Sequence, residues 1–462
     1  MKPFLPTPSY DAARNVAEVL RAAGHQAYLA GGCVRDLLLG LTPKDYDVAT
    51  SATPETVLSL FPSKKTLTVG AHFGVVLVCD SDATHTEVAT FRHDGAYTDG
   101  RRPDAVRFST DPREDVLRRD FTINGMLLDP ALYDATGDPT QATLDYVGGR
   151  EDLAARTLRA IGDPLLRFAE DKLRMLRAVR FAARLGFAID PVTAAAIRQL
   201  ASQITVISPE RIRDELTLIL TEGGARRGFE LLDQLSLLPH ILPEIAKLHG
   251  VQQPPEYHPE GDVWIHTLLL LEKLPAGAAP TLAWGALLHD VGKPATFRAP
   301  DPSDPHDRIR FNGHVEVGVR ISEEILARLR FSNDEIAQIT ALVKNHMRFG
   351  DVKHMRESTL KRFLRLPQFD EHLALHRMDC LSSHGDLSLY DFAKERYAAA
   401  PVESIQPKLL LTGRELIDAG YRPSPRFKKM IEAAEDAQLE GTVHTPAEAL
   451  RFVHTRFGPP AK

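Results

Sequence analysis

Short apolar segments separated by glycine and proline occupy the first third of the chain. Residues 10 to 24 place apolar side chains on one side and end at a glycine, which predicts an amphipathic helix that covers one face of a sheet. Apolar or alternating runs that are typical of strands cover residues 28–30, 45–49, 74–79, 84–91 and 105–108. The pattern predicts a small mixed sheet with helices in this part of the chain.

Apolar residues at helical spacing dominate the remainder. Residues 167–184 contain neither Gly nor Pro, and Leu173, Leu176 and Val179 form one apolar stripe, so we expect a continuous helix there. Residues 197–220 continue as helices, and helices rich in Leu and His follow later in the chain. We therefore predict the α+β class, with a small mixed sheet followed by all-α segments.

The length and charge of the chain limit what it can bind. A chain of 462 residues is too long for one ordinary core, so we expect three or four domains. The formal net charge of -6 argues against nucleic-acid binding by bulk charge, so a polynucleotide partner must meet a local basic surface. Residues 156–184 supply one, because they carry eight Lys or Arg against three acids.

Cysteine usage and hydropathy indicate the compartment. The three cysteines, Cys33, Cys79 and Cys380, are widely separated and form neither a metal-ligand pair nor a disulfide framework. No apolar run reaches the roughly 18 to 20 residues of a membrane span, and the first residues have no apolar signal region. We expect a cytoplasmic protein that does not associate with a membrane.

The segment around Gly31 and Gly32 has the features of a phosphate-binding turn. A short apolar strand runs into the two glycines, and the residues after them have helical spacing. Adjacent glycines let backbone N–H groups approach an anion, and the following helix presents its positive end to the same place. Arg35 would add a charged fork.

Two carboxylates follow this turn. Asp45 and Asp47 are separated by one residue in the predicted strand 45–49, so their side chains share a face. They repel each other unless a divalent cation lies between them, and oxygen ligands of this kind suit magnesium. Metal ions that bridge triphosphate oxygens and an attacking hydroxyl are typical of nucleotidyl transfer.

The residues from Gly31 to Asp47 resemble the signature of class II tRNA nucleotidyltransferases, the CCA-adding enzymes and bacterial poly(A) polymerases of the DNA polymerase β superfamily. The family pattern reads G-G-x-V-R-D, then L-L-G, then D-x-D, and the chain matches it at Gly31, Gly32, Val34, Arg35, Asp36, Leu38, Leu39, Gly40, Asp45 and Asp47. The resemblance implies a polymerase β-like head in which Asp45 and Asp47 hold Mg²⁺. It also implies that the glycine turn and Arg35 bind the nucleotide.

A third carboxylate, Glu87, lies inside the predicted strand 84–91. Beside the two aspartates it would help to hold metal and could assist deprotonation of the attacking hydroxyl. A plain acid at the edge of a strand is an equal alternative.

Two further segments carry the same resemblance. Residues 118–125 read R-R-D-F-T-I-N-G and depart from the family motif R-R-D-F-T-x-N-A only at Gly125. Taken alone, two arginines before an acid favour a surface salt bridge, but the likeness implies that Arg119 contacts the triphosphate or sugar. Residues 145–153 resemble the family's hinge motif, D-x-x-G-G-x-x-D-L.

The polar segment between residues 92 and 103 resembles the family's flexible loop, and Tyr97, Arg101 and Arg102 carry that likeness. In CCA-adding members this loop is linked to the switch from adding C to adding A. A plain hairpin loop is the alternative.

The predicted helix 167–184 carries the residues expected to choose the base. Asp171 and Arg174 are three apart and would share a face, where such pairs are usually ordinary ion pairs. A carboxylate can accept from the exocyclic amine of C or A while a guanidinium donates to the neighbouring ring atom, and G and U present a carbonyl instead. The likeness to the family's E-D-x-x-R motif, continued by Arg177 and Arg180, favours nucleotide selection without a template.

The C-terminal half suggests a second chemistry. Nitrogen and oxygen donors recur there at His266, His289, Asp290, His314, His346 and Asp379. A single buried His is more often a core residue. The set formed by His266, His289, Asp290 and Asp379, however, resembles the H, H-D and D ligands of HD-domain metal-dependent phosphohydrolases. The remaining two histidines could complete a two-metal centre, and the donors suit Mg²⁺ or a divalent transition metal. The alternative is a folded body that supports the tRNA, with metal optional.

The resemblance implies four domains. These are a nucleotidyltransferase head (1–155), a helical RNA-binding neck (156–250), an HD-type body (251–385) and a helical tRNA-binding tail (386–462). We expect Mg²⁺-dependent addition of C-C-A from CTP and ATP to the 3′ end of tRNA, held by its acceptor arm. The rivals are a poly(A) polymerase or a partial CC- or A-adding enzyme, an HD phosphohydrolase whose head only binds nucleotide, and a pure RNA-binding protein.

Overall fold

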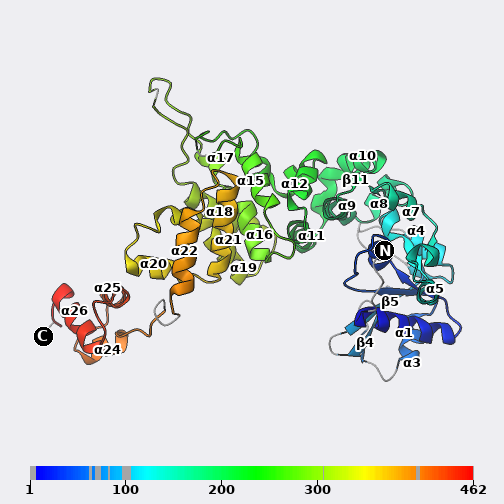
Figure 1. The fold of residues 1–462 in the computed structure, drawn as a ribbon, viewed down its shortest axis with the longest axis horizontal. Coiled ribbons are helices and arrows are strands. Elements are labelled where there is room, and N and C mark those ends of the chain that lie inside the picture. Colours follow the sequence, from blue (N-terminus) through cyan, green and yellow to red (C-terminus); the bar gives the residue numbers. More distant parts are fainter. Residues whose placement is uncertain are drawn as a thin grey trace. The chain divides into compact units, whose positions relative to one another are not determined.

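The computed structural model describes residues 7–61, 65–67, 74–81, 84–95, 106–256, 258–304, 306–401 and 406–460. The chain divides into two compact units, Met1–Pro243 and Glu244–Lys462 (Figure 1). The division into four smaller domains stays a prediction. The segment with Tyr97, Arg101 and Arg102 lies outside the described residues.

The first unit combines strands and helices. Its described strands are β1 (Ala27–Ala30), β2 (Asp47–Thr50), β3 (Lys65–Leu67), β4 (Val75–Ser81), β5 (Thr84–Thr90), β6 (Arg92–Asp94), β7 (Val106–Phe108), β8 (Met126–Leu128), β9 (Thr143–Asp145), β10 (Thr157–Leu158) and β11 (Ala188–Ile189). Its described helices are α1 (Pro8–Ala22), α2 (Gly32–Leu38), α3 (Pro54–Leu60), α4 (Pro112–Leu117), α5 (Pro130–Thr136), α6 (Pro139–Ala142), α7 (Gly149–Ala154), α8 (Pro164–Glu170), α9 (Leu173–Leu185), α10 (Pro191–Leu200), α11 (Pro209–Thr221), α12 (Ala225–Gln234) and α13 (Leu238–Ile241).

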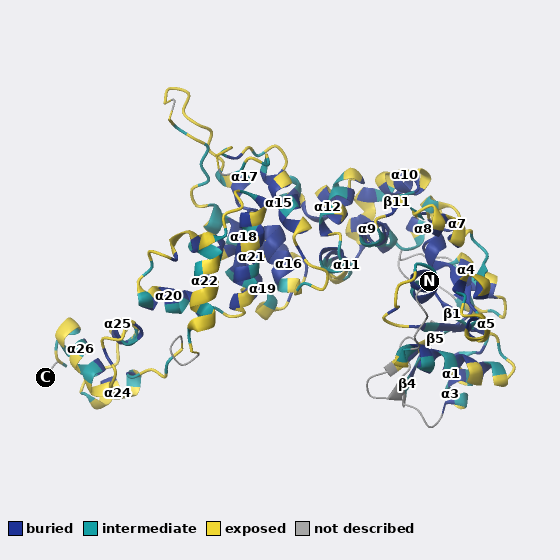
Figure 2. Cartoon of the chain, in the orientation of Figure 1, coloured by how far each residue is buried: buried dark blue, intermediate teal, exposed yellow. Residues whose placement is uncertain are grey.

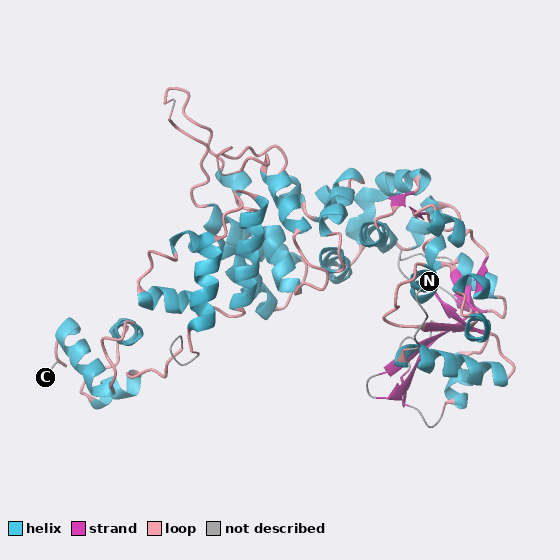
Figure 3. Ribbon diagram, viewed as in Figure 1, coloured by secondary structure: helices cyan, strands magenta, loops and turns pink. Residues whose placement is uncertain are grey.

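A seven-stranded sheet organises the head, in the order β3-β4-β5-β2-β1-β8-β9. Strands β2 and β5 are parallel, whereas the other neighbours are antiparallel, so the predicted mixed sheet is confirmed (Figure 3). Ala30 pairs with Asp47, and Val48 pairs with Val88. The end of β1 that leads into the glycine turn therefore lies beside the start of β2.

Helix α1 covers this sheet, as its pattern predicts. The Thr7 side chain accepts a hydrogen bond from the backbone N–H of Tyr10 and so caps the helix. Tyr10, Val16 and Leu20 are buried where α1 packs against β1, β2 and β5. Burial of each large apolar side chain contributes about 1.5–3 kcal/mol, which fixes the sheet beneath the site.

The predicted continuous helix over residues 167–184 is wrong in one respect. Helix α8 ends at Glu170, Asp171 has an extended backbone (φ -143°, ψ 107°), and α9 begins at Leu173. The Asp171 carboxylate accepts a hydrogen bond from the Leu173 backbone N–H. Asp residues favour this local bonding outside helices, so the sequence permits a break without Gly or Pro.

The second unit consists of helices joined by loops, and its described part contains no named strand (Figure 3). Its described helices are α14 (Pro243–Ala246), α15 (Val263–Glu272), α16 (Pro280–Leu288), α17 (Lys293–Thr296), α18 (His314–Arg328), α19 (Asn333–Asn345), α20 (Glu357–Leu364), α21 (Phe369–Ser382), α22 (Ser388–Ala399), α24 (Gly413–Asp418), α25 (Arg426–Leu439) and α26 (Pro446–Phe457). Within the described residues, no helix is both long enough and apolar enough to span a bilayer.

Helix α16 is the centre of this unit. It is apolar all round, its residues from Leu282 to Leu288 are buried, and it packs against α15, α19 and α21 (Figure 2). A helix with no polar face is stable only inside a core. The residues that follow α16, His289 and Asp290, are therefore delivered into the interior.

Candidate functional site

The two expected metal-binding aspartates line one cavity in the head. Asp47 is the first residue of β2, whereas Asp45 precedes the strand, so the prediction that both lie within one strand is wrong for Asp45. Both nevertheless line a cavity of about 590 Å³ together with the glycine turn and residues of α9. The chain thus brings the predicted acids and the predicted base-selecting helix together.

The electrostatics at Asp47 favour a cation. Burial, the nearby charge of Glu87 and the charge of Asp45 raise the pKa of Asp47 to about 7, against a usual value of 3.8, while Arg119 acts in the opposite direction. Acids that repel one another in this way are stabilised by a divalent ion between them.

Glu87 occupies the strand next to Asp47. It lies on β5, one residue from Val88, which pairs with Val48, and its side chain is exposed. Its charge is one cause of the raised pKa of Asp47, yet Glu87 does not line the cavity. Its roles as a third metal ligand and in deprotonation of the attacking hydroxyl stay predictions.

The glycine turn has the geometry of a phosphate cradle. Gly31 has φ +80°, a region that disfavours residues with a Cβ, and α2 begins at Gly32. A Cβ at Gly31 would lie 3.2 Å from the Arg119 guanidinium, so Arg119 lies directly over the turn. The glycine turn and the Arg119 guanidinium, two groups suited to an anion, therefore lie next to each other in the cavity.

Arg35 is less available than its sequence position suggests. Its side chain is 3% exposed, and it donates hydrogen bonds to Asp36 and to Asn124 Oδ1 at 2.8 and 2.7 Å. The guanidinium lines the cavity but also fixes α2 to the segment after α4. Its contact with a nucleotide stays a prediction.

Asp115, which the sequence analysis did not select, holds the two arginines of the R-R-D-F-T-I-N-G segment, residues 118–125. Its buried carboxylate accepts hydrogen bonds from Arg118 and Arg119, at 2.6 and 2.9 Å at the shortest. Burial raises the pKa of Asp115, but the two guanidinium groups outweigh it and hold this pKa below its usual value. The spacing of Asp115 three and four residues before the arginines was the available signal.

The residues that are expected to select the base are arranged differently from the prediction. Because Asp171 lies outside α9, it does not share a helix face with Arg174. Arg211 of α11 donates to both carboxylate oxygens of Asp171, at 3.3 and 2.8 Å. Arg174 pairs with Glu170 and donates to the Arg118 carbonyl oxygen. Both residues still line the cavity.

The two further arginines of α9 are held by acids. Arg177 pairs with Asp120 at 2.7 Å, and buried Arg180 pairs with Glu215 at 2.8 Å and with Glu222. Both line the cavity, and their contact with nucleotide stays a prediction. Further cavity residues that the sequence analysis did not select as site residues are Asp36, Lys44, Arg118, Asp120, Asn124, Leu173, Phe181, Arg184, Arg211 and Glu222.

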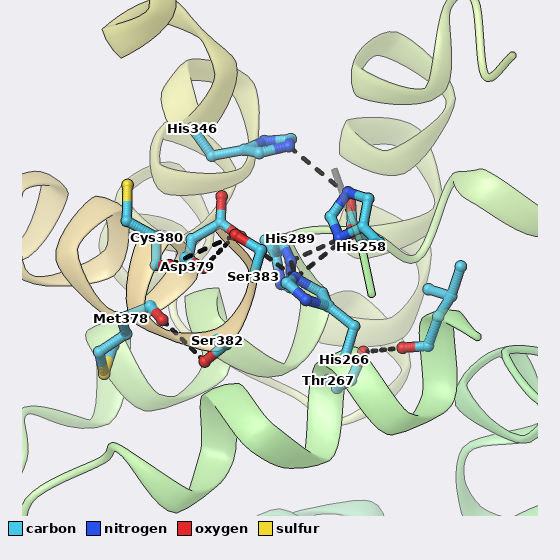
Figure 4. A network of polar contacts seen from close by, with 12 residues as sticks. His258, His266, Thr267, His289, His346, Met378, Asp379, Cys380, Ser382 and Ser383 are labelled. Atoms are coloured by element: carbon cyan, nitrogen blue, oxygen red, sulfur yellow. Dashed lines mark hydrogen bonds and ion pairs between the residues drawn. The ribbon is translucent and has the colours of Figure 1, made fainter. Parts of the chain in front are cut away.

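All six predicted donors of the C-terminal half gather in one place. One group contains His266, His289 and Asp379, and the other contains Asp290, His314 and His346; within each group the donor atoms lie within 4.8 Å of one another. Figure 4 shows His266, His289 and Asp379 converging from three helical segments.

The donor distances fit metal binding. His266 Nε2 lies 3.1 Å from Asp379 Oδ1 and 3.3 Å from His289 Nε2. Asp290 Oδ2 lies 3.1 Å from His289 Nε2. Asp290 Oδ1 lies 3.8 Å from His314 Nε2 and 3.7 Å from His346 Nε2. Donors about 3–4 Å apart can surround an ion at the usual bond lengths of roughly 2.0–2.2 Å, and Asp290 could bridge two ions.

The charges of this centre are tightly coupled. Burial raises the pKa of Asp379, but its bond to His266 and the charges of His266 and His289 together outweigh burial and hold this pKa well below its usual range. Burial lowers the pKa of His346 to about 4, so its ring is neutral at pH 7. Neutral imidazole and ionised carboxylate are the forms that bind metal.

Comparisons with known sequences agree with the geometry of the head. Residues 27–159 match the family profile described as the poly A polymerase head domain, and residues 186–248 match one described as the probable RNA and SrmB-binding site of polymerase A. Residues 315–453 match a profile for tRNA nucleotidyltransferase domain 2.

Individual relatives span nearly the whole chain. A CCA-adding enzyme from Bacillus pumilus is 40% identical over 94% of this chain and 94% of its own length. An A-adding tRNA nucleotidyltransferase from Deinococcus radiodurans is 34% identical over 92% of this chain and 94% of its own. The crystal structure of the Bacillus stearothermophilus CCA-adding enzyme in complex with CTP is similar, with a TM-score of 0.71, 27% identity, and coverage of 98% of this chain and 99% of that chain. The protein described here belongs to the CCA-adding tRNA nucleotidyltransferase family, whose members use a divalent metal.

Proposed function

We propose that the chain adds C-C-A to the 3′ end of tRNA from CTP and ATP, without a nucleic-acid template. The observation that supports this most strongly is the single cavity that contains Asp45, Asp47, the glycine turn, Asp171 and Arg174. It combines groups suited to a metal ion, a triphosphate and a base edge. The tRNA acceptor arm would contact the basic neck.

Each group has a role in the proposed reaction. Asp45 and Asp47 would hold Mg²⁺, which when bound neutralises phosphate charge and activates the attacking hydroxyl. The glycine turn and Arg119 bind the triphosphate. The tRNA 3′-hydroxyl attacks the α-phosphate in line, a new phosphodiester bond forms, the bond between the α- and β-phosphates breaks, and pyrophosphate leaves.

Base selection rests on Asp171 and Arg174. The carboxylate accepts from the exocyclic amine that C and A share, and the guanidinium donates to the adjacent ring atom. A carboxylate offers about four acceptor sites, so the two bonds from Arg211 and the one from the Leu173 backbone N–H leave about one site on Asp171 for the base.

Two tRNA substrates of different length distinguish the possible activities by their products. One tRNA ends before the first C and another ends after the second C, and each is incubated with CTP, ATP or both. Full C-C-A addition to the shorter tRNA supports the proposal. Addition of A alone, of C alone or of a long A tail indicates an A-adding enzyme, a CC-adding enzyme or a poly(A) polymerase. The A-adding relative makes the first of these the main alternative.

The second candidate activity is metal-dependent phosphohydrolysis in an HD-type centre. The six convergent donors support it, and Mg²⁺ or a divalent transition metal fits them. His266, His289, Asp290 and Asp379, with His314 and His346, would hold the metal, and a metal bound there would supply a nucleophilic water for attack on a phosphate ester. Release of phosphate from RNA ending in a 3′-phosphate or a 2′,3′-cyclic phosphate tests this activity. Absence of release, with or without added metal, would favour a supporting body.

A cytoplasmic location belongs to the same proposal. The three cysteines are free thiols, as expected in a reducing compartment. Fractionation of cells with an antibody against the chain tests it.

A further inference from the structure

Two imidazole rings share one carboxylate oxygen beside the candidate metal centre. Glu260 Oε1 lies 2.8 Å from His266 Nδ1 and 2.8 Å from His258 Nδ1. The Glu260 side chain is only 8% exposed, so water competes little for these bonds. His258 lines the cavity that contains Asp290 and Asp379, although the sequence analysis selected neither it nor Glu260.

His266 differs from the other histidines of the centre in what holds its ring. The rings of His289, His314 and His346 each bond through Nδ1 to the backbone carbonyl three residues earlier, at Ala286, Phe311 and Val343. Those carbonyls belong to the backbone of α16, of the turn before α18 and of α19, so a side-chain substitution does not remove them. The ring of His266 instead depends on a side chain from the segment before α15, so a substitution can remove its support.

The same three residues could in principle hold an ion of their own, since their donor atoms also cluster. The distances argue against this. One oxygen at 2.8 Å from two nitrogens has ordinary N–H···O geometry. His266 also points its other nitrogen, Nε2, at Asp379 and His289, so with Nε2 as the ligand of the candidate metal centre a second ion on Nδ1 would require a ring that has lost both protons.

We propose that Glu260 is a positioning residue of the metal centre. Its Oε1 keeps the proton of His266 on Nδ1 and aims Nε2 at the metal position, and the same oxygen holds His258 at the cavity wall. A partner of this kind raises the basicity of a ligating histidine and typically changes metal affinity by about 10–100-fold. This inference rests on the proposed binding of divalent metal by the HD-type centre.

The effect should be confined to one half of the centre. Glu260 contacts the group formed by His266, His289 and Asp379, and within the described residues no bond links it to His314 or His346. A general loss of folding would weaken both groups, whereas loss of positioning weakens one.

The experiment measures Mn²⁺ binding to the full chain. All proteins carry D47N so that the head does not compete for ions, and the set comprises this reference, E260A, E260Q and the control E256Q, since Glu256 is an exposed acid of the same segment. After treatment with a chelator, free Mn²⁺ is followed by electron paramagnetic resonance during titration. Melting temperatures in EDTA report folding.

We expect E260A to weaken one ion by about 10–100-fold and to leave the other within about threefold. E260Q retains an acceptor oxygen and should lose less, and E256Q should match the reference. Unchanged binding in E260A and E260Q, or equal weakening of both ions, would overturn the positioning role alone. If the reference binds no ion, the metal centre itself fails and the inference fails with it.

Discussion

Substitution of Asp47 by Asn should stabilise the metal-free head while abolishing nucleotide transfer. Asn keeps the size of the side chain but removes a charge that burial and two neighbouring acids disfavour. The gap between the usual pKa of 3.8 and the raised value of about 7 corresponds to at most about 4 kcal/mol.

The sign of the effect depends on pH. Between pH 3.8 and about 7 the folded chain holds a proton on Asp47 that the unfolded chain has lost. The contribution of Asp47 to the free energy of unfolding therefore falls as pH rises through this window and is fully unfavourable above about pH 7. The gain from D47N should be near 4 kcal/mol at about pH 8 and about 1.5 kcal/mol at about pH 5.

Hydrogen exchange provides a suitable assay. Both tryptophans, Trp264 and Trp284, lie in the C-terminal unit, so their fluorescence does not report on the head. Exchange of peptides from β1, β2 and β8, followed by mass spectrometry in EDTA, gives the free energy of opening of the sheet. D45N is the matched control, because Asp45 also lines the cavity but is exposed, so D45N removes only the share of the repulsion at Asp47 that Asp45 contributes.

Both variants should lose transfer of C and A to tRNA, but D47N should slow exchange more than D45N. One contradicting result is a free energy of opening of the sheet at pH 8 that is the same in D47N and the wild type, and another is a gain in this free energy in D47N that does not depend on pH. Either result would show that the charge of Asp47 does not destabilise the metal-free head. An equal gain in D45N would assign the effect to general charge reduction instead.

Other predictions concern the neck and the hinge. Arg211→Ala should free the Asp171 carboxylate, raise misincorporation of U and G at least severalfold, and leave the melting temperature nearly unchanged. Single-nucleotide incorporation with each triphosphate measures the misincorporation. Unchanged fidelity would count against a role of Arg211 in positioning Asp171. Gly149→Ala should destabilise the head by about 2 kcal/mol or more, because its Cβ would lie 2.4 Å from the Thr122 carbonyl oxygen, while Gly148→Ala should cost only about 1 kcal/mol for a left-handed backbone with open space. Hydrogen exchange of the same sheet compares the two, and equal costs would refute the steric explanation.

The sequence contained enough to predict the head and its acids. Helix α1, the glycine turn, the strands on both sides of it and the convergence of Asp47 with Arg119 follow from local patterns and family motifs. The six donors of the C-terminal half also meet as expected, because an apolar helix must be buried and carries His289 with it.

The sequence did not predict the long-range pairs. The break at Asp171 depends on a capping bond and on Arg211, which lies forty residues away in sequence, and no local pattern encodes that contact. Glu260, the partner of His266, was missed because it precedes α15, and its separation of six residues from His266 matches no helical repeat. Asp115 was missed because it precedes the segment that matches the family motif, residues 118–125.

The most direct test of the account is incorporation of the four nucleoside triphosphates, each offered alone, onto tRNA that lacks its terminal C-C-A and onto tRNA that ends in C-C. The account predicts that only CTP extends the first substrate, that only ATP extends the second, and that UTP and GTP extend neither. Extension by UTP or GTP at a rate comparable to CTP or ATP would contradict base selection by Asp171 and Arg174.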